Sequence, residues 1–234
     1  MSKSKKYFRL LPHGPIQKVL PNIFTVVGSM RLFGLFQYSR VMTVLNDNGK
    51  LALINPVRVD DSTLSELSKL GSIDYVFKIG QLHNVDLKFY MDQFSPELWV
   101  NKGDPSISAY EQVNYFDDVN ELPILNAKVK VLEGSKIKES ILVTPADGGC
   151  LHSCDAFVNM GLDPMHNWLT KNLSKFLPDP TYIGPNWYKI AKPPEKSMRS
   201  VMDFDFKNFI PAHGEPILED AKGKLKEYLE SFYA

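Results

Sequence analysis

The sequence predicts an α/β protein in which helices cover a sheet, and three observations lead to this fold class. Two hairpins open the chain, with strands at residues 16–20 and 23–27 and at 40–45 and 51–54. Strands and helices then alternate, and the alternation continues through the second half of the chain. The 234 residues are 44% hydrophobic and 23% charged, a globular composition that is large enough to bury a substantial core.

Turn residues define the two hairpins. Pro21 and Asn22 separate the first pair of strands, and Asn48 with Gly49 separates the second pair. An Asn-Gly pair supplies the positive φ that a tight hairpin turn requires. Residues 30–38, between the hairpins, are rich in aromatic side chains, and they form either a flap over a pocket or a packing loop.

The apolar period changes after the second hairpin. Asp60 offers an N-cap, leucines then recur at helical spacing, and Gly71 ends the helix. The apolar run at residues 73–79 predicts a buried strand, followed by a helix at 89–94 and a short strand at 98–100. This order places one helix before the buried strand and one after it.

The second half repeats this style. We expect strands at residues 129–132, 140–144, 150–153 and 209–210, and helices at residues 165–177, 196–204 and 219–232. The helix at 165–177 is expected to bury Trp168, Leu169, Leu173 and Phe176. Prolines from Pro178 to Pro194 mark a long connection, and its aromatic residues either line an apolar substrate pocket or pack beneath the connection; they are Tyr182, Trp187 and Tyr188.

The net charge and the targeting signals limit which classes of partner the protein can have. With 27 basic and 27 acidic residues the net charge is zero, which argues against a nucleic-acid partner. The basic tract at residues 2–6 predicts a flexible tail, so we expect an N-terminal tail over residues 1–15 and a single domain over 16–234. No apolar run reaches the roughly 20 residues of a membrane helix, and no signal peptide is visible. We therefore expect a cytoplasmic protein without a membrane partner.

Three chemistry-bearing residues follow predicted strands. Asp86 ends the stretch IDYVFKIGQLHNVD, Asp155 follows a strand in CLHSCDAF, and His213 follows one in FIPAHGEPI. In this order, behind two hairpins, the motifs resemble the metallo-β-lactamase superfamily, which includes glyoxalase II-like hydrolases. The resemblance extends over residues 16–232. It implies a four-layer αββα sandwich with an active site at the strand ends along one edge.

The metal-binding loop departs from the family pattern. Family members carry T-H-x-H-x-D-H, and its histidines and aspartate hold two metal ions that share a water. With Asp86 as the anchor, the histidine positions fall on Leu82, Asn84 and Leu87, while His83 is shifted by one place. We expect this shift to point the His83 ring elsewhere unless the backbone adjusts, and we expect Leu82 and Leu87 to be at least partly buried, filling the space that metal and water occupy in active relatives.

The later motifs match the family better. Asp155 matches the bridging aspartate and His213 the final histidine, but residues 129–140 contain no histidine at the place of a further ligand. The resemblance thus implies either no cofactor or one weakly bound divalent ion, zinc or iron, held by Asp86, Asp155 and His213. Other interpretations stay open, because Asp86 also suits a helix N-cap, Asp155 a turn cap and His213 hydrogen bonds to backbone groups.

Further residues have two interpretations each. Cys150 and Cys154, with His152 between them, form either a metal clip of unusual spacing or buried small side chains; no disulfide is expected in a cytosolic chain. Glu139 either donates an oxygen ligand or is a solvated charge, which the sequence favours. His166, beside Trp168 on a predicted helix face, is interpreted as structural.

Three functions remain for this constellation. The sequence favours a protein that has lost the two-metal site, is non-catalytic or weakly catalytic, and binds a small molecule or partner in the former active-site cleft. The second is a single-metal hydrolase acting on an ester, thioester or lactone. The third is a metal-free enzyme that uses His213 with Asp86 or Asp155 as acid and base. The sequence indicates neither the substrate nor the oligomeric state.

Overall fold

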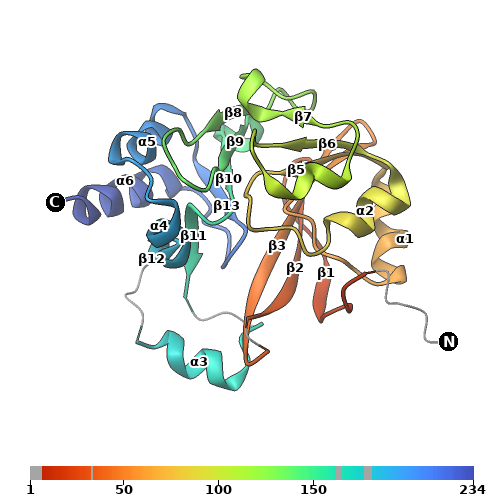
Figure 1. Ribbon diagram of the computed structural model, residues 1–234, viewed down its shortest axis with the longest axis horizontal. Coiled ribbons are helices and arrows are strands. Elements are labelled where there is room, and N and C mark those ends of the chain that lie inside the picture. Colours follow the sequence, from red (N-terminus) through yellow and green to blue (C-terminus); the bar gives the residue numbers. More distant parts are fainter. Residues whose placement is uncertain (1–6, 33, 162–164, 177–180) are drawn as a thin grey trace.

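The computed structural model describes residues 7–32, 34–161, 165–176 and 181–234, and its strands form two main sheets (Figure 1). The seven-stranded sheet keeps chain order: β1 (His13–Leu20), β2 (Ile23–Leu32), β3 (Phe36–Asp47), β4 (Lys50–Ile54), β5 (Ser72–Lys78), β6 (Glu97–Val100) and β7 (Asn114–Tyr115). The four-stranded sheet runs in the order β13 (Asn208–Pro211), β10 (Cys150–Ser153), β9 (Ser140–Thr144) and β8 (Lys128–Val131). A small third sheet pairs β11 (Phe157–Met160) with β12 (Thr181–Ile183).

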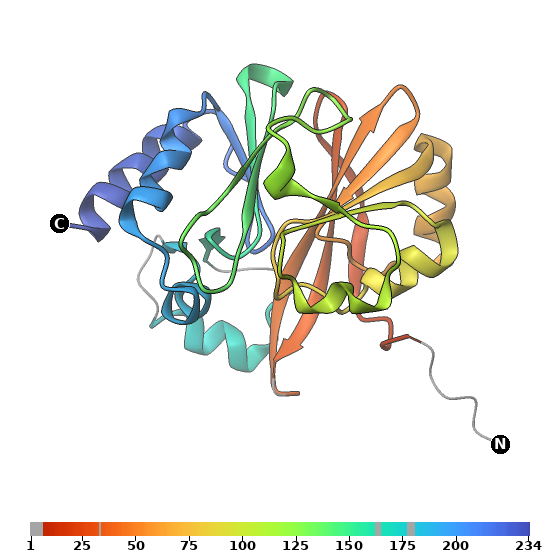
Figure 2. The same ribbon diagram turned by 45° about the horizontal axis from the view of Figure 1, so that its top comes forward.

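Helices cover the outer face of each main sheet (Figure 2). Helices α1 (Asp61–Leu70) and α2 (Leu87–Phe94) lie on the seven-stranded sheet, while α4 (Pro185–Ala191), α5 (Glu195–Arg199) and α6 (Ala221–Phe232) lie on the four-stranded sheet. Three buried apolar clusters fill the three spaces between these four layers. Burial of apolar area stabilises by about 25 cal/mol per Å². The αββα sandwich expected from the sequence is confirmed.

The hairpins confirm the turn signals and extend beyond them. Asn48 and Gly49 have φ values of 52° and 86°, as a tight turn between β3 and β4 requires. Strand β1 begins at His13, before the strand expected from residue 16. Residues 30–38 are neither a flap nor a packing loop, because β2 and β3 continue through most of this segment as one long hairpin. Cross-strand pairing, from Ile23 opposite Leu45 out to residues 32 and 36, therefore orders the segment.

The helix expected at residues 165–177 is shorter and faces the other way. Helix α3 (Trp168–Ser174) leaves Trp168 79% and Phe176 86% exposed, and Leu173 is exposed as well. Polar contacts hold this helix on the β2–β3 hairpin, since the backbone N–H of Gln37 donates to Oγ1 of the buried Thr170 at 2.9 Å. The predicted burial of these three side chains was thus wrong, whereas Leu169 is partly buried. Leu177, Pro178 and Pro180, like the tract at residues 2–6, lie outside the described residues.

The proline-rich connection is partly helical and packs inward. Pro185 occupies the first turn of α4, where its missing N–H is not needed. Trp187 is 2% exposed, and Tyr182 and Tyr188 pack against the same outer cluster. The packing interpretation of these three aromatic residues is confirmed.

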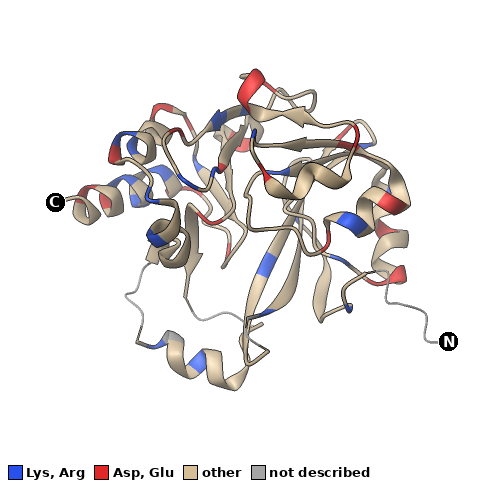
Figure 3. Cartoon of the chain, in the orientation of Figure 1, with Lys and Arg blue, Asp and Glu red and all other residues tan. Residues whose placement is uncertain are grey.

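The surface mixes both signs of charge. Basic and acidic residues are interspersed over the helical layers at both sides of the sandwich (Figure 3). No helix in the described parts of the chain combines the length and the hydropathy that a membrane span needs.

The cysteines and His152 belong to the core. Cys150 and Cys154 are free and buried, as expected for small core side chains, and Cys154 lies at one edge of the sandwich. His152 is 1% exposed, and its Nε2 lies 3.2 Å from Thr144 Oγ1. Burial lowers the pKa of His152 to about 3. This histidine is therefore a neutral core residue at neutral pH.

His152 should make the fold sensitive to acid. Because the unfolded chain binds this proton with a pKa near 6.5, stability falls as pH drops from about 6.5 to about 3, by roughly 5 kcal/mol at most. We expect His152→Gln to flatten the dependence of the urea-unfolding free energy on pH across this window. An unchanged slope, measured beside a His166→Gln control, would contradict this.

Candidate metal centre

A buried lysine holds the start of the loop at residues 80–86, which follows β5. Lys78 Nζ donates to the carbonyl oxygens of Gly80 and Gln81 at 3.1 Å each and forms an ion pair with Asp104. Both side chains of this pair are fully buried. Burial lowers the pKa of Lys78, while the Asp104 carboxylate opposes that shift. The loop therefore leaves the sheet in a fixed direction.

Gly80 brings this loop against the other sheet. A Cβ at this position would lie 2.5 Å from Cys154 Sγ, so no side chain fits there. Ser140 N donates to the Ile79 carbonyl at 2.8 Å, and Gly80 forms an isolated bridge with Glu139. The end of β5 and the end of β10 thus meet at one edge of the sandwich.

Glu139 organises the turn that carries Asp155. Its Oε1 accepts from Ser153 Oγ at 2.9 Å and Cys154 N at 2.8 Å, and its Oε2 accepts from the backbone N–H groups of Asp155 and Ala156 at 2.8 and 2.9 Å. Glu139 has no exposed surface, so its interpretation as a solvated charge was wrong. Burial, with the Asp155 charge nearby, raises the pKa of Glu139 to about 8, although its four donors favour the ionised form.

Three side chains from distant parts of the chain converge at this edge, and we call His83, Asp155 and His213 the triad cluster. His83 Nε2 lies 3.1 Å from His213 Nε2 and 3.6 Å from Asp155 Oδ1, and His213 Nε2 lies 3.2 Å from the same Oδ1. The expected convergence of Asp155 and His213 is confirmed. The expectation that His83 points elsewhere was wrong, because the loop turns its ring inward and leaves Leu82 and Asn84 exposed.

The backbone orients His213. Its Nδ1 donates to the Ser39 carbonyl at 2.8 Å, which leaves Nε2 directed at the cluster. His83 differs, because its Nδ1 is buried with no hydrogen-bond partner among the described residues. His213 therefore has a ring orientation fixed by β3, while packing alone holds His83.

Burial and mutual charge set the protonation of the triad cluster. Burial lowers the pKa of His83, and the Asp155 carboxylate only partly offsets this. Burial also opposes ionisation of His213, but its hydrogen bond to Asp155 and the charge of that carboxylate raise its pKa above the ordinary value. Burial would raise the pKa of Asp155, yet the two imidazoles hold it well below its usual range. An ionised carboxylate thus faces two imidazole nitrogens.

Asp86 pairs with a buried arginine. Arg40 Nη2 donates to Asp86 Oδ2 at 3.0 Å and to the Pro56 carbonyl at 2.8 Å. Asp86 occupies the N-cap position of α2, but its side chain makes no capping hydrogen bond. The guanidinium of Arg40 is close enough to the triad cluster to oppose protonation of both His83 and His213. Metal binding by Asp86 itself stays a prediction.

The two leucines at the family's histidine positions differ in burial. Leu87 is 2% exposed and packs in the cluster under α2, as expected. Leu82 is 45% exposed, so its expected burial was wrong. His83 turns inward at this point of the loop, and Leu82 and Asn84 on either side of it stay exposed. His166, which precedes α3, contacts the Tyr38 ring edge-on at 5.5 Å.

Solved structures share this architecture over nearly the whole chain. The DIM-1 metallo-β-lactamase superposes with a TM-score of 0.64 at 15% identity, covering 95% of this chain and 99% of that one. The chain has the metallo-β-lactamase fold. The FIM-1 metallo-β-lactamase from Pseudomonas aeruginosa, in its mono-zinc form, gives a TM-score of 0.63 at 8% identity and covers 95% of this chain and 97% of its own.

The metallo-β-lactamase fold also occurs in a neighbour of a different kind. A variant of a flavo di-iron protein from Thermotoga maritima gives a TM-score of 0.58 at 15% identity, with 94% of this chain and 62% of that chain covered. No family model and no curated protein matches the sequence. Sequence identities this low show a shared fold only, so the chemistry has to be argued from the residues of the site.

The donor set of the triad cluster fits one metal ion of the kind that the metallo-β-lactamase fold accommodates. A tetrahedral ion with bonds of about 2.0–2.1 Å holds its ligand atoms about 3.3 Å apart. The three interatomic distances of the cluster, 3.1, 3.2 and 3.6 Å, bracket this value. Because His213 donates from Nδ1 to Ser39, loss of the proton on Nε2 leaves there a lone pair that a cation beside Asp155 would accept. Cys154 Sγ lies within 4.8 Å of the His83 and Asp155 ligand atoms and is a fourth candidate.

Sequence reasoning missed three residues of this site within the metallo-β-lactamase fold. His83 was set aside because it falls one place from a family position. Arg40 gave no signal beyond a charge at the start of the strand predicted at residues 40–45. Glu139 was detectable by its place near a missing ligand, but its four hydrogen bonds depend on a turn that only the folded chain brings close.

Proposed function

We propose that the protein is a single-metal hydrolase that cleaves an ester, thioester or lactone bond. The observation that carries this proposal is the set of mutual distances in the triad cluster, 3.1 to 3.6 Å between three ligand-type atoms. His83, Asp155 and His213 would hold the ion. A bound zinc or iron ion supplies a polarised carbonyl and a water with a pKa near neutrality.

The other residues position these ligands. Glu139 holds the turn at Asp155 through backbone hydrogen bonds, and Ser39 fixes the His213 tautomer. The Arg40 guanidinium engages the Asp86 carboxylate and lies close enough to His83 and His213 to disfavour added positive charge, so a second cation would be repelled there. This charge, together with Leu82, Asn84 and Leu87 at the family's histidine positions, supports one ion in place of two.

This proposal ranks the single-metal hydrolase above the non-catalytic interpretation that the sequence favoured. The change rests on His83, whose imidazole stands beside Asp155 and His213 and takes the place that the aligned motif gave to Asp86, which pairs with Arg40. The metal-free alternative keeps one supporting observation, the hydrogen-bonded pair of His213 and Asp155 at 3.2 Å. A general base alone contributes about 10²–10⁴-fold, which is less than an activated metal-bound water gives.

Metal content is the first test. We expect purified protein, incubated with zinc or iron and dialysed, to retain close to one ion per chain by elemental analysis. Asp155→Asn and His213→Gln should each remove most of it, since two ligands make a weak site. His166→Gln is the matched control outside the cluster. Asp86→Asn should keep the ion; its loss there would restore Asp86 as a ligand.

Activity is the second test. Across a panel of thioesters, lactones and β-lactams, we expect hydrolysis that a chelator abolishes, with kcat/KM falling at least about 10²-fold in His83→Gln and Asp155→Asn. Hydrolysis that persists in chelator but is lost in His213→Gln would favour the metal-free alternative. Absence of both metal and hydrolysis would favour a binding protein.

A further inference from the structure

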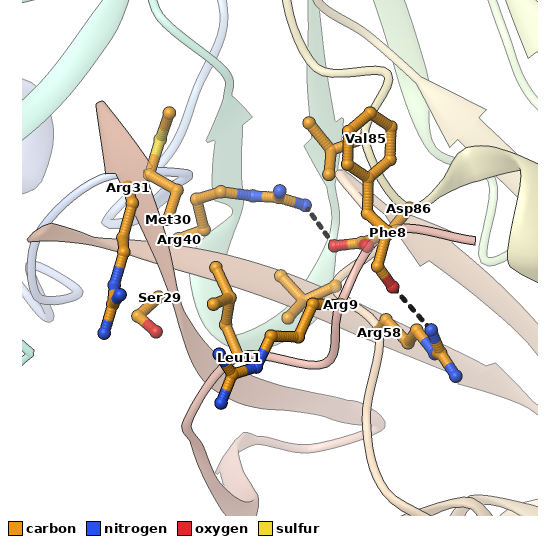
Figure 4. A pocket seen from close by; sticks show the side chains of 11 residues that line it. Phe8, Arg9, Leu11, Ser29, Met30, Arg31, Arg40, Arg58, Val85 and Asp86 are labelled. Atoms are coloured by element: carbon orange, nitrogen blue, oxygen red, sulfur yellow. Dashed lines mark hydrogen bonds and ion pairs between the residues drawn. The ribbon is translucent and has the colours of Figure 1, made fainter. Parts of the chain in front are cut away.

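A cavity of about 240 Å³ lies beside the metal centre and belongs to no part of the proposed chemistry. Arg40 and Asp86 line it, whereas the three residues of the triad cluster do not. Its walls come from β2, β3, the segment after β4 and the stretch at residues 8–11 (Figure 4). The cavity therefore shares the Arg40–Asp86 pair with the site.

The N-terminal wall of this cavity is tied in place. Arg58 Nη1 donates to the Phe8 carbonyl at 2.6 Å, and Ser29 Oγ donates to the Pro12 carbonyl at 2.8 Å. The Arg58 guanidinium also lies 4.9 Å from the centre of the Phe89 ring, a cation–π contact with α2. These contacts hold residues 8–12 against the sheet and close one side of the cavity.

The interior offers an apolar surface to a ligand. Phe8, Leu11, Met30, Val57 and Val85 contribute side chains to the lining. Phe8 is 66% exposed and Val85 39% exposed, although both are large apolar groups. A short hydrocarbon body would cover this surface and gain about 25 cal/mol per Å² of apolar area removed from water.

Arg40 keeps unused donors at this cavity. Of the five N–H groups of a guanidinium, the two on Nη2 bond Pro56 and Asp86. Nε is buried with no partner, and Nη1 makes no hydrogen bond within the described parts of the chain. Arg40 is 4% exposed, and a buried donor without a partner calls for an acceptor that the chain does not supply.

Further arginines surround Arg40. Arg9, Arg31 and Arg58 also line the cavity, so four guanidinium groups stand against the single carboxylate of Asp86. Arg31 and Arg58 direct their head groups away from the Arg40–Asp86 pair (Figure 4). Arg9 and Arg31 form no ion pair among the described residues. This excess of positive charge attracts an anion to the opening of the cavity. Inside the cavity, Arg40 is the group whose hydrogen-bond donors lack an acceptor among the described residues.

We propose that this cavity binds a small amphiphilic oxyanion, a carboxylate or phosphate head group on a short apolar body. The head group accepts from Nη1 of Arg40, the donor that is neither bonded nor enclosed by the described parts of the chain, and the body lies along Met30, Val57 and Val85. The site is independent of the proposed hydrolysis, because it needs no metal ion and none of the triad cluster.

Isothermal titration calorimetry with three six-carbon probes tests this site on the full chain. We expect hexanoate and hexyl phosphate to bind with one site per chain, and hexan-1-ol to bind at least tenfold more weakly. Each titration is run with a chelator and again with zinc. Binding that needs zinc would assign the anion to the metal centre and overturn the proposal, while equal binding with and without zinc supports it. The tighter of the two anions identifies the head group.

Two variants locate the binding. Arg40→Lys keeps the charge, but an ammonium group has only three donors, and Pro56 and Asp86 take two of them. The donors that the guanidinium offers to the head group are then largely lost, so we expect at least a tenfold loss of affinity. Val85→Trp fills the cavity without changing Arg40 and should abolish binding even if Arg40→Lys folds poorly. Arg199→Gln, at an exposed arginine outside the cavity, is the control and should bind as the parent does. Unchanged affinity in Val85→Trp would overturn the proposal.

Discussion

Replacing Lys78 by methionine is expected to lower the free energy of unfolding by about 3–5 kcal/mol, which is the typical cost of removing one partner from a buried ion pair. The Asp104 carboxylate would stay buried, with only Ser106 donating to it. The carbonyls of Gly80 and Gln81 would also lose their shared donor. Methionine has nearly the length of the lysine stem, so the loss reports the charge and the hydrogen bonds. Urea unfolding monitored by circular dichroism measures it.

An exposed lysine gives the matched control. Lys88 is 58% exposed and pairs with Asp92 one helical turn away, so Lys88→Met should cost less than about 1 kcal/mol. Adding Asp104→Asn to Lys78→Met should recover part of the loss, because the remaining buried group is then neutral. A loss below 1 kcal/mol in Lys78→Met would mean that the pair contributes little to folding. Since Lys78 directs the loop that carries His83, metal affinity should fall with stability.

Glu139→Gln is expected to lower the free energy of unfolding by about 2–4 kcal/mol at pH 9. Each carboxylate oxygen accepts two donors, and the amide group of glutamine would set an NH₂ against one of these pairs. Two buried donors would then lack an acceptor, at about 1–3 kcal/mol each. The turn that carries Asp155 should loosen at the same time, so bound metal should decrease as well.

The pH of this measurement distinguishes the two charge states of Glu139. At pH 9 the carboxyl is ionised, because its pKa is raised only to about 8. A group whose folded pKa is raised loses stability as pH rises from its unfolded value, near 4.5, to about 8. Glu139→Gln should therefore cost more at pH 6 than at pH 9, because the parent chain loses stability over this range and the glutamine variant, which does not titrate, keeps its own. Glu133→Gln, at an exposed position of the same β8–β9 connection, should change stability by under about 0.5 kcal/mol at either pH. If Glu139→Gln costs the same at both pH values, the Glu139 carboxyl is ionised throughout the range from pH 6 to pH 9.

Local sequence patterns predicted the strands well where one face or both faces are buried. The Asn48–Gly49 turn, the Asp60 cap and the strands at β9 and β10 follow from turn chemistry and apolar period alone. The long β2–β3 hairpin was missed, because its outer half is ordered by pairing and not by burial. Helix α3 was misread for a related reason, since hydrogen bonds through Thr170 and Gln37 fix its position and its apolar side chains stay in solvent.

The sequence by itself determined the layered α/β architecture and two members of the site, Asp155 and His213, because each directly follows a strand and strand ends meet at one edge of the sandwich. Only the tertiary structure decided that His83 joins them. A loop residue points inward or outward according to how the ends of the loop are held. Here Lys78 and the close approach of Gly80 to Cys154 fix its start, and the Arg40–Asp86 pair holds its end. The same holds for Arg40 and Glu139, whose roles depend on partners 46 and 14–17 positions away in the chain. Residue spacing along the chain carries no information on such contacts.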